Sequence, residues 1–439
     1  MCFPLLRTLA RALAFVGMAA VASACSNTAG PSYAVTPQSL APIKHVFTII
    51  LENQTYSNTF GVTMPVPYLS QTAAAQGMLL QNYYGTSHFS LGNYVSLVSG
   101  QAVTTDNQDD CGAPSAAGYP GSNYIDVAQT GTAQYNQVAG NGCVYPAAAT
   151  TVVDQLTAAG LTWKGYMEDM GNDPTREPAT CGQPIGGIGA ADNTQAAQVP
   201  PSYNKGGTTA TTDQYAARHN PFVYFHSVID SGGCAQHVVP LNDSTLTADL
   251  QSVATTPNYV WITPNLCNDG HDVPCKSPGS PKSYVNENTF LAKWIPIITR
   301  SPAFQKDGLL MVTFDETSLS DTSASGVNVG YDGTACCNEP SGPNTQLPGV
   351  PPLATAQYFN IPITGGVGNS GGGQTGTLLL SNYIAPGVST VPYNHYYMLH
   401  TVESLFGLPY LGYAGYPGTT SFGADVFGTN AQRQQVISL

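Results

Sequence analysis

Apolar segments of strand length alternate with helical segments along most of this chain, and this alternation limits the fold more than any other feature. The strand candidates are 44–53, 161–169, 258–265, 308–316 and 375–384. The helix candidates are 68–77, 151–160, 246–255, 288–301 and 396–407. This order predicts an α/β fold with a mostly parallel central sheet and helices on both faces. Long loops rich in Gly, Asn, Thr and Pro are expected over one edge of the sheet, at 101–150, 170–215 and 317–375.

The first 24 residues have the pattern of a signal peptide. Two arginines precede a short apolar stretch, and the small residues Ala22-Ser23-Ala24 end it. Cys25 follows directly, as in a bacterial lipobox, so a lipid anchor on Cys25 is expected; cleavage after Ala24 without lipidation is the alternative. Residues 25–42 read as a tether, and 43–439 as a single domain. The protein is therefore expected to be exported, as a periplasmic, membrane-anchored or secreted protein.

Charge and cysteine content restrict the partners and the compartment. The formal net charge is −13, and removal of residues 1–24, with two arginines and no acidic residue, makes it −15. A chain this acidic repels nucleic acid and anionic membranes. Eight cysteines remain after Cys2 and Cys25 are set aside, which predicts disulfides without fixing their pairing. We expect Cys336 and Cys337 to pair with different partners, because a bridge between neighbours is strained.

Polar residues gather where the predicted strands end. In parallel sheets, ligands bind beyond the carboxyl ends of the strands, so these residues are expected to meet at one rim. They are Glu52 and Asn53, Asp269 and His271, and Asp315 and Glu316. Either member of such a pair could simply cap a helix or end a strand, but repeated acids repel one another unless a cation or proton neutralises them.

Ser90 begins a helical stretch, and two interpretations of it are open. Its hydroxyl could accept a hydrogen bond from a backbone N–H as an N-cap. It could also be a nucleophile, held where the free N–H groups of the helix receive an anion such as phosphate.

An oxygen-rich metal site is expected at the same rim. Its ligands would be Glu52, Asn53, Ser90, Asp315 and Glu316. Oxygen ligands suit one hard divalent ion, Mg²⁺, Ca²⁺ or Mn²⁺, better than Zn²⁺.

Six motifs occur in the order that one family shows. They are HVFTIILENQTYSNTFG, SLGNYVSLVSG, RHNPFVYF, PNLCNDGHD, VTFDE and YNHYYMLHTVESLFGLPYLG. Together they resemble the bacterial phosphoesterase family of acid phosphatases and phospholipases C, within the alkaline-phosphatase-like superfamily. The resemblance runs from about residue 43 to 415. It implies an alkaline-phosphatase-like fold with long loops over the site.

The resemblance also implies roles for individual residues. Ser90 matches the nucleophile, and His219 and His271 match imidazoles that contact the phosphate. The metal ligands of the family match Glu52, Asn53, Asp315 and Glu316. Gly92 stands where relatives often have Pro, and Glu316 where some have Asp. His395 is a further candidate for the edge of the site.

The implied function is an exported, metal-dependent phosphomonoesterase of the acid phosphatase type, acting through a phosphoserine on a small phosphate ester. A phospholipase C or another phosphodiesterase with the same centre is the first alternative. A non-catalytic surface-binding lipoprotein is the second. No twin-arginine pair and no C-terminal β region are apparent in the sequence, and both are typical of the phospholipase C members, so the phosphatase is favoured.

Overall fold

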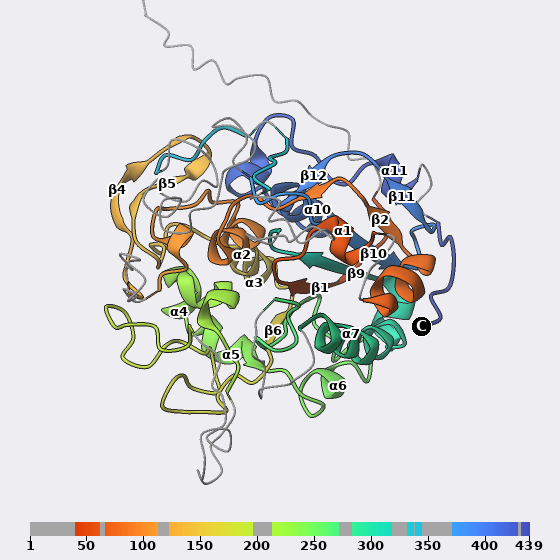
Figure 1. Cartoon of the computed structure of the whole chain (residues 1–439), viewed down its shortest axis with the longest axis horizontal. Helices are drawn as coiled ribbons and strands as arrows, with labels where there is room; N and C mark the ends of the chain where they lie inside the picture. The colour runs from red at the N-terminus through yellow and green to blue at the C-terminus, as the bar shows by residue number, and fades with distance from the viewer. Residues whose placement is uncertain are drawn as a thin grey trace, which may run out of the picture. The chain divides into compact units, whose positions relative to one another are not determined.

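An eight-stranded sheet lies at the centre of the chain, in the order β11-β2-β10-β9-β1-β8-β6-β7 (Figure 1). The computed structural model describes residues 40–61, 66–112, 123–195, 213–271, 283–317, 332–337, 339–344, 371–428 and 432–439. The strands of this sheet are β1 (His45–Leu51), β2 (Met78–Leu80), β6 (Trp163–Met167), β7 (Val238–Pro240), β8 (Tyr259–Thr263), β9 (Gly308–Phe314), β10 (Thr377–Ser381) and β11 (Gly387–Ser389).

The sheet is mostly parallel, as the sequence predicts. β1 lies between β8 and β9 and is parallel to both, so that Phe47 is level with Val260 on one side and Leu310 on the other. β10 is the exception, because it runs antiparallel to β9 and to β2. All five strand candidates from the sequence form strands of this sheet. The predicted α/β class is confirmed.

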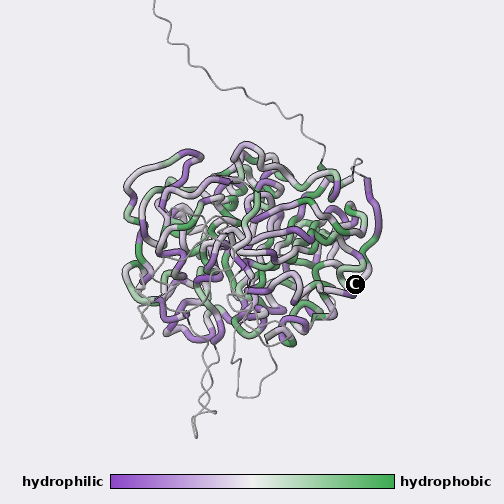
Figure 2. Tube along the Cα trace, turned by 45° about the horizontal axis from the view of Figure 1, so that its top comes forward, coloured by the Kyte–Doolittle hydropathy of each residue, from purple (hydrophilic) through white to green (hydrophobic). Residues whose placement is uncertain are grey.

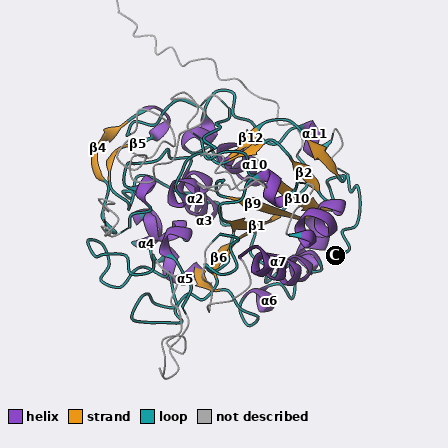
Figure 3. Ribbon diagram, in the orientation of Figure 1, coloured by secondary structure: helices purple, strands orange, loops and turns teal. Residues whose placement is uncertain are grey.

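Helices cover both faces of the sheet (Figure 3). Successive side chains of β1 point to opposite faces: Val46 and Ile50 join one hydrophobic cluster, and Phe47 and Ile49 join the other. The first cluster includes residues of α2 (Ser90–Ser99), α3 (Val152–Ala158) and α10 (His395–Phe406). The second includes residues of α7 (Ser283–Thr299) and α8 (Pro302–Asp307). Because both faces of β1 are buried, its sequence is a nearly continuous apolar run.

The remaining elements are short. Two further two-stranded sheets pair β3 (Tyr83–Tyr84) with β12 (Tyr393–Asn394), and β4 (Ala128–Thr132) with β5 (Val138–Asn141). The short α-helices are α1 (Tyr56–Thr59), α4 (His226–Ile229), α5 (Gly233–His237), α6 (Leu246–Asp249) and α11 (Ala424–Phe427). Single turns of other helix types are η1 (Tyr68–Ala73), η2 (Ala74–Gln76), η3 (Asn107–Asp109), η4 (Gln134–Asn136), η6 (Ala217–His219), η7 (Pro221–Tyr224) and η8 (Gly412–Gly415).

The helix expected over 246–255 is shorter than predicted. It ends at Asp249, because the hydroxyls of Thr255 and Thr256 both donate to the backbone oxygen of Asp249, at 2.9 and 3.1 Å. Threonine hydroxyls compete in this way with the helical hydrogen bonds.

Three disulfides connect the described loops. Cys111 pairs with Cys143 and Cys181 with Cys234. The expectation that Cys336 and Cys337 have different partners is wrong, because the structure joins these two neighbours to each other. Four of the other cysteines are already paired among themselves, and strain in a neighbouring pair was the only argument from sequence. Cys275 lies outside the described residues.

Hydrophilic segments are frequent along the outer loops of the chain (Figure 2). The described residues fall within one compact unit, Ser39–Leu439. Among the described helices, none is both long and apolar enough to cross a bilayer. The predicted signal peptide, most of the tether and the anchor at Cys25 lie outside the described residues.

Candidate active site

Three neighbouring strands deliver acidic residues to one edge of the sheet. Glu52 follows β1, Asp315 follows β9, and Asp269 lies in the loop after β8. Backbone hydrogen bonds extend the pairing beyond the strands: Glu52 N donates to Asp269 O at 2.8 Å, and Asp315 N donates to Leu51 O at 2.9 Å. Parallel strands end at the same edge, so the predicted convergence of these residues is observed.

Ser90 is the first residue of α2 and is not its N-cap. The N-cap position is Phe89, which makes no side-chain capping bond. The Ser90 hydroxyl instead donates to Oε2 of Glu52 at 2.7 Å. The side chain therefore points at the acidic edge of the sheet, and its oxygen keeps a lone pair for another partner.

Residues around Ser90 fix the turn that leads into α2. The side-chain oxygen of Asn93 accepts from Thr86 N at 2.8 Å and from Ser87 N at 3.0 Å. A Cβ at Gly92 would collide with the side chains of Val103 and Ser87. This close approach accounts for glycine at position 92.

Glu52 is held by donors on both carboxylate oxygens. Besides Ser90, Asn53 Nδ2 donates to Oε2 at 3.1 Å, and the hydroxyl of Tyr94 donates to Oε1. Tyr94 lies one helical turn after Ser90, so both side chains reach Glu52 from the same face of α2. Burial, and then the charges of Asp315 and Asp269, raise the pKa of Glu52 well above its usual value.

Asp315 is fixed through one oxygen only. Its Oδ1 accepts from Asn53 N at 2.9 Å and from Glu316 N at 2.6 Å, whereas its buried Oδ2 has no hydrogen-bond partner. Burial raises the pKa of Asp315, and the hydrogen bond from the Asn53 amide partly offsets this rise.

Glu316 and His395 flank Asp315 in different ways. The Glu316 carboxylate is buried and faces Nδ1 of His88, an imidazole whose pKa burial lowers to about 4. His395 reaches the backbone of Asp315, because its Nε2 lies 2.6 Å from Asp315 O. Burial lowers the pKa of His395 to about 4, so this imidazole is neutral and donates the hydrogen bond. His395 therefore supports the loop of Asp315 from behind.

The two predicted imidazoles lie in different surroundings, one buried and one exposed. His219, in η6, stacks on Tyr94 with ring centroids 5.3 Å apart, and its Nε2 lies 3.4 Å from Glu52 Oε1. Burial, and then the charges of Arg218 and His271, lower the pKa of His219 well below its usual value. His271 is exposed, and its backbone N donates to Asp269 Oδ1 at 2.9 Å.

The donor set at this edge fits a hard cation. Within the described ranges, no three His, Cys, Asp or Glu side chains converge into a metal site by themselves. The side chains that do converge belong to Glu52, Asp315, Asn53 and Ser90; two of these are buried carboxylates, and Asn53 faces Glu52 with its donor atom Nδ2. A cation would satisfy Asp315 Oδ2 and reduce the repulsion between the two carboxylates. The fifth predicted ligand, Glu316, faces His88 instead.

Comparison with known protein families adds a second kind of evidence to the geometry of the site. The model described as the Phosphoesterase family matches residues 62–409. The chain belongs to the phosphoesterase family. This match confirms the predicted resemblance, although it begins after Glu52 and Asn53.

The curated relatives of this phosphoesterase include fungal and bacterial proteins. The chain is 25% identical over 243 residues to the phosphate-repressible acid phosphatase of Penicillium chrysogenum, covering 55% of this chain and 42% of that protein. It is 22% identical over 407 residues to the phosphatidylinositol-3-phosphatase of Mycobacterium tuberculosis, covering 92% and 91%. The chain thus spans less than half the length of the first of these relatives.

The solved structures that this chain resembles are remote from it in sequence. A protein in the alkaline phosphatase superfamily from Vibrio parahaemolyticus superimposes with a TM-score of 0.40 at 12% identity. The superposition covers 84% of this chain and 68% of that one.

Proposed function

We propose that this protein hydrolyses phosphate monoesters by forming a phosphoserine at Ser90, in the manner of an acid phosphatase. One observation carries the proposal: the Ser90 hydroxyl starts a helix and is hydrogen-bonded, at 2.7 Å, to a carboxylate in a buried acidic cluster. A serine whose hydroxyl contacts a proton acceptor has the nucleophile and the base that phosphoryl transfer to a side chain requires.

The reaction has two displacements. In the first, Ser90 Oγ attacks phosphorus, its proton passes to Glu52 Oε2, and the bond from phosphorus to the ester oxygen breaks. The exposed His271 gives a proton to the leaving alkoxide. In the second, water attacks phosphorus and returns a proton to His271, the bond from Oγ to phosphorus breaks, and Glu52 Oε2 returns the first proton to Oγ.

One divalent ion is part of the proposal. Glu52, Asn53, Ser90 and Asp315 would hold it, with Glu316 able to join only by leaving His88. When bound, such an ion neutralises phosphate charge and lowers the pKa of the serine hydroxyl. The oxygen ligands favour Mg²⁺, Ca²⁺ or Mn²⁺ over Zn²⁺.

His219 has a different task from His271. Because its pKa is lowered, it is neutral at neutral pH and provides one N–H without adding charge. Its stacking on Tyr94 holds its Nε2 3.4 Å from Oε1 of Glu52, whose other oxygen accepts from Ser90. A fixed donor of this kind stabilises charge on the phosphate oxygens, and one such donor is typically worth about 3 kcal/mol.

A phosphomonoester is favoured over a phosphodiester as the substrate. The relative that covers most of this chain is named a phosphatidylinositol-3-phosphatase, and the Penicillium relative an acid phosphatase. Both names describe removal of a terminal phosphate. Export is supported by two disulfides that close long loops, Cys111–Cys143 and Cys181–Cys234, because such bonds persist in oxidising compartments.

The decisive experiment is a substrate panel with a trapping step. Purified protein is assayed on an aryl phosphate, a bis-aryl phosphate, phosphatidylinositol 3-phosphate and phosphatidylcholine, with and without chelator. Rapid acid quenching with a labelled monoester should place label on Ser90. Faster cleavage of phosphatidylcholine than of the aryl phosphate would replace this proposal with a phospholipase C. A wild-type protein that turns over no substrate would support the non-catalytic lipoprotein.

A further inference from the structure

A buried network joins the start of α2 to Arg218, a residue of the RHNPFVYF motif to which the resemblance assigned no role. Leu91 N, directly after Ser90, donates to Oδ1 of Asp110 at 2.9 Å. The other carboxylate oxygen of Asp110 lies 3.8 Å from Nε of Arg218. The amide beside the nucleophile is thus linked to Arg218 through one carboxylate.

Gln195 closes this network from the outside. Its Nε2 donates to Asp110 O at 3.0 Å, and its backbone oxygen accepts from Arg218 Nη1 at 2.7 Å. With only 10% of its side chain exposed, the guanidinium is held in one orientation. A planar guanidinium fixed in this way is preorganised for a phosphate.

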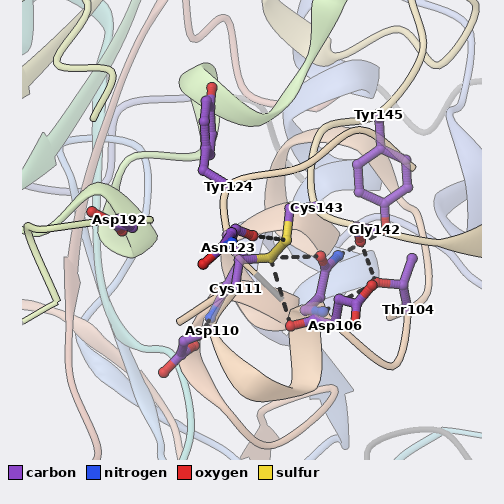
Figure 4. The surroundings of a disulfide bond; sticks show 12 residues. Thr104, Asp106, Asp110, Cys111, Asn123, Tyr124, Gly142, Cys143, Tyr145 and Asp192 are labelled. Carbon is purple, nitrogen blue, oxygen red and sulfur yellow. Dashed lines mark hydrogen bonds between the residues drawn. A yellow bond between two sulfur atoms is a disulfide. The ribbon is translucent and has the colours of Figure 1, made fainter. Parts of the chain in front are cut away.

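The Asp110 loop is tied down by the neighbouring disulfide (Figure 4). Cys111 is bonded to Cys143, and the Thr104 hydroxyl donates to Gly142 O at 2.7 Å. Asp110 and Cys111 both adopt left-handed backbone conformations, with φ of 52° and 53°, which residues other than glycine seldom adopt. The disulfide and the surrounding hydrogen bonds keep the carboxylate of Asp110 on the α2 amide.

The acidic surroundings of the α2 start call for a positive charge, which Arg218 provides. Glu52, Asp315, Glu316 and Asp110 all lie around the start of α2. Among the described residues, Arg218 is the one Lys or Arg whose side chain forms an ion pair with any of these acids. A phosphate monoester adds up to two more negative charges, so it needs a cation from the protein besides any bound ion.

The imidazole of His219 is a second, independent feature beside the start of α2. His219, next to Arg218, is buried, and its Nε2 has no hydrogen-bond partner. A buried polar atom without a partner is costly, so a ligand that accepts from it is expected. Arg218 and His219 thus each face a carboxylate that holds the start of α2: Arg218 faces Asp110, and His219 faces Glu52.

We infer that Arg218 is a further substrate-binding residue whose guanidinium contacts the phosphate at the start of α2, with Asp110 as its positioning residue. This inference rests on the proposed function and refines its substrate class. A monoester dianion gains more from this contact than a diester monoanion does, so Arg218 selects for monoesters.

The test measures inorganic phosphate binding by calorimetry, with the same divalent ion present throughout, and kcat/KM on an aryl phosphate and a bis-aryl phosphate. Arg218→Gln should weaken phosphate binding by about tenfold to a hundredfold, as loss of a charged hydrogen bond predicts. It should lower kcat/KM for the monoester more than for the diester. The matched control is Lys293→Gln, which removes a cation paired with Asp243 at 2.9 Å and should change neither quantity.

Asp110→Asn tests the positioning role. As a single substitution, Asp110→Asn should weaken phosphate binding. Combined with Arg218→Gln it should add little further loss, because the two substitutions act through the same contact. Strictly additive losses would assign Asp110 a purely structural role. If Arg218→Gln does not fold, Arg218→Lys carries the test, since lysine lacks the planar fork and should still bind phosphate less tightly.

Two failures can be told apart. If the wild-type protein hydrolyses the monoester and binds phosphate, and folded Arg218→Gln does both equally well, this inference alone is overturned. If the wild-type protein neither binds phosphate nor hydrolyses any ester, the proposed function fails as well.

Discussion

The hydroxyl of Ser90 and the carboxylate of Glu52 form a 2.7 Å hydrogen bond between the first residue of α2 and the residue that follows β1. The position of the proposed nucleophile therefore depends on how α2 packs on the sheet. Tyr94 strengthens this packing, because its hydroxyl holds the other oxygen of the same carboxylate.

Replacing Ser90 tests the nucleophile. Ser90→Ala should lower kcat on an aryl phosphate by at least about a thousandfold while the protein remains folded, because the attacking atom is lost. Steady-state assays and circular dichroism check both parts. Ser99→Ala is the matched control: this serine is buried at the other end of α2, donates only to Val95 O, and should keep nearly full activity. More than a few per cent of activity in folded Ser90→Ala protein would rule out the phosphoserine.

Glu52→Gln and Asp315→Asn should each lose divalent metal. Both changes remove a negative ligand, and affinity should fall by at least about tenfold to a hundredfold. Metal content after dialysis, measured by mass spectrometry, is the readout. Glu403→Gln changes a buried carboxylate in α10 that accepts from Leu411 N, and should keep its metal. A wild-type protein that is metal-free and fully active in chelator contradicts the metal site.

Tyr94→Phe removes the donor to Glu52 Oε1 and keeps the ring that stacks on His219. Loss of a hydrogen bond to a charged group costs about 1.5–3 kcal/mol, so kcat should fall by roughly tenfold or more with little change in KM. Kinetics on the aryl phosphate measure this split. An unchanged kcat would mean that Glu52 is positioned without Tyr94.

The pH dependence of stability should carry a contribution from Glu177. Burial, and then the hydrogen bond with Asp213, raise the pKa of Glu177 to about 9. The folded protein therefore holds a proton here that the unfolded chain, with an ordinary glutamate, loses near pH 4.5. The unfolded state binds fewer protons between these values, so this contribution to stability falls as pH rises from about 4.5 to about 9.

Thermal unfolding of wild type and Glu177→Gln across that range measures the effect. The difference in melting temperature between the two proteins should shift in favour of Glu177→Gln as pH rises. A difference that does not vary with pH would place the Glu177 pKa near its ordinary value.

Disulfide Cys181–Cys234 should contribute more to stability than Cys336–Cys337. The first closes a loop between residues 53 apart and is expected to add about 2–4 kcal/mol, whereas neighbours close almost no loop. Urea unfolding of Cys181→Ala/Cys234→Ala and of Cys336→Ala/Cys337→Ala compares them. Equal losses in the two double variants would contradict the loop-entropy argument.

Residues at strand ends were predictable from sequence. Glu52 and Asp315 follow strongly apolar strands. The ends of neighbouring parallel strands lie close together whatever conformation the connecting loops adopt. The sequence indicated Ser90 as a candidate site residue, but it did not show whether Ser90 is the N-cap of the helix. That depends on whether the helix begins at residue 90 or 91, and helix ends cannot be predicted to one residue.

Residues brought in by tertiary packing were not predictable. Tyr94 was hidden in an apolar helix, and only the docking of α2 on β1 turns its hydroxyl towards Glu52. Asp110 reaches the α2 amide through a loop whose path depends on the Cys111–Cys143 bond. Eight cysteines allow 105 pairings, so that path was not accessible from sequence. The wrong expectation for Cys336 and Cys337 rested on the strain of a bridge between neighbours, and the structure joins these two residues.

The place of β1 in the sheet has a consequence for biosynthesis. β1 is the first of the described strands to be made, yet its two neighbours begin only at Tyr259 and Gly308. Until those segments emerge, a nascent chain carries an apolar strand with both edges unpaired, which is the kind of segment that joins other chains into aggregates. Closing pairs this far apart in sequence is also slow, because loop entropy is lost before the contacts form. Refolding yield should therefore fall as protein concentration rises, and a holding chaperone should restore it.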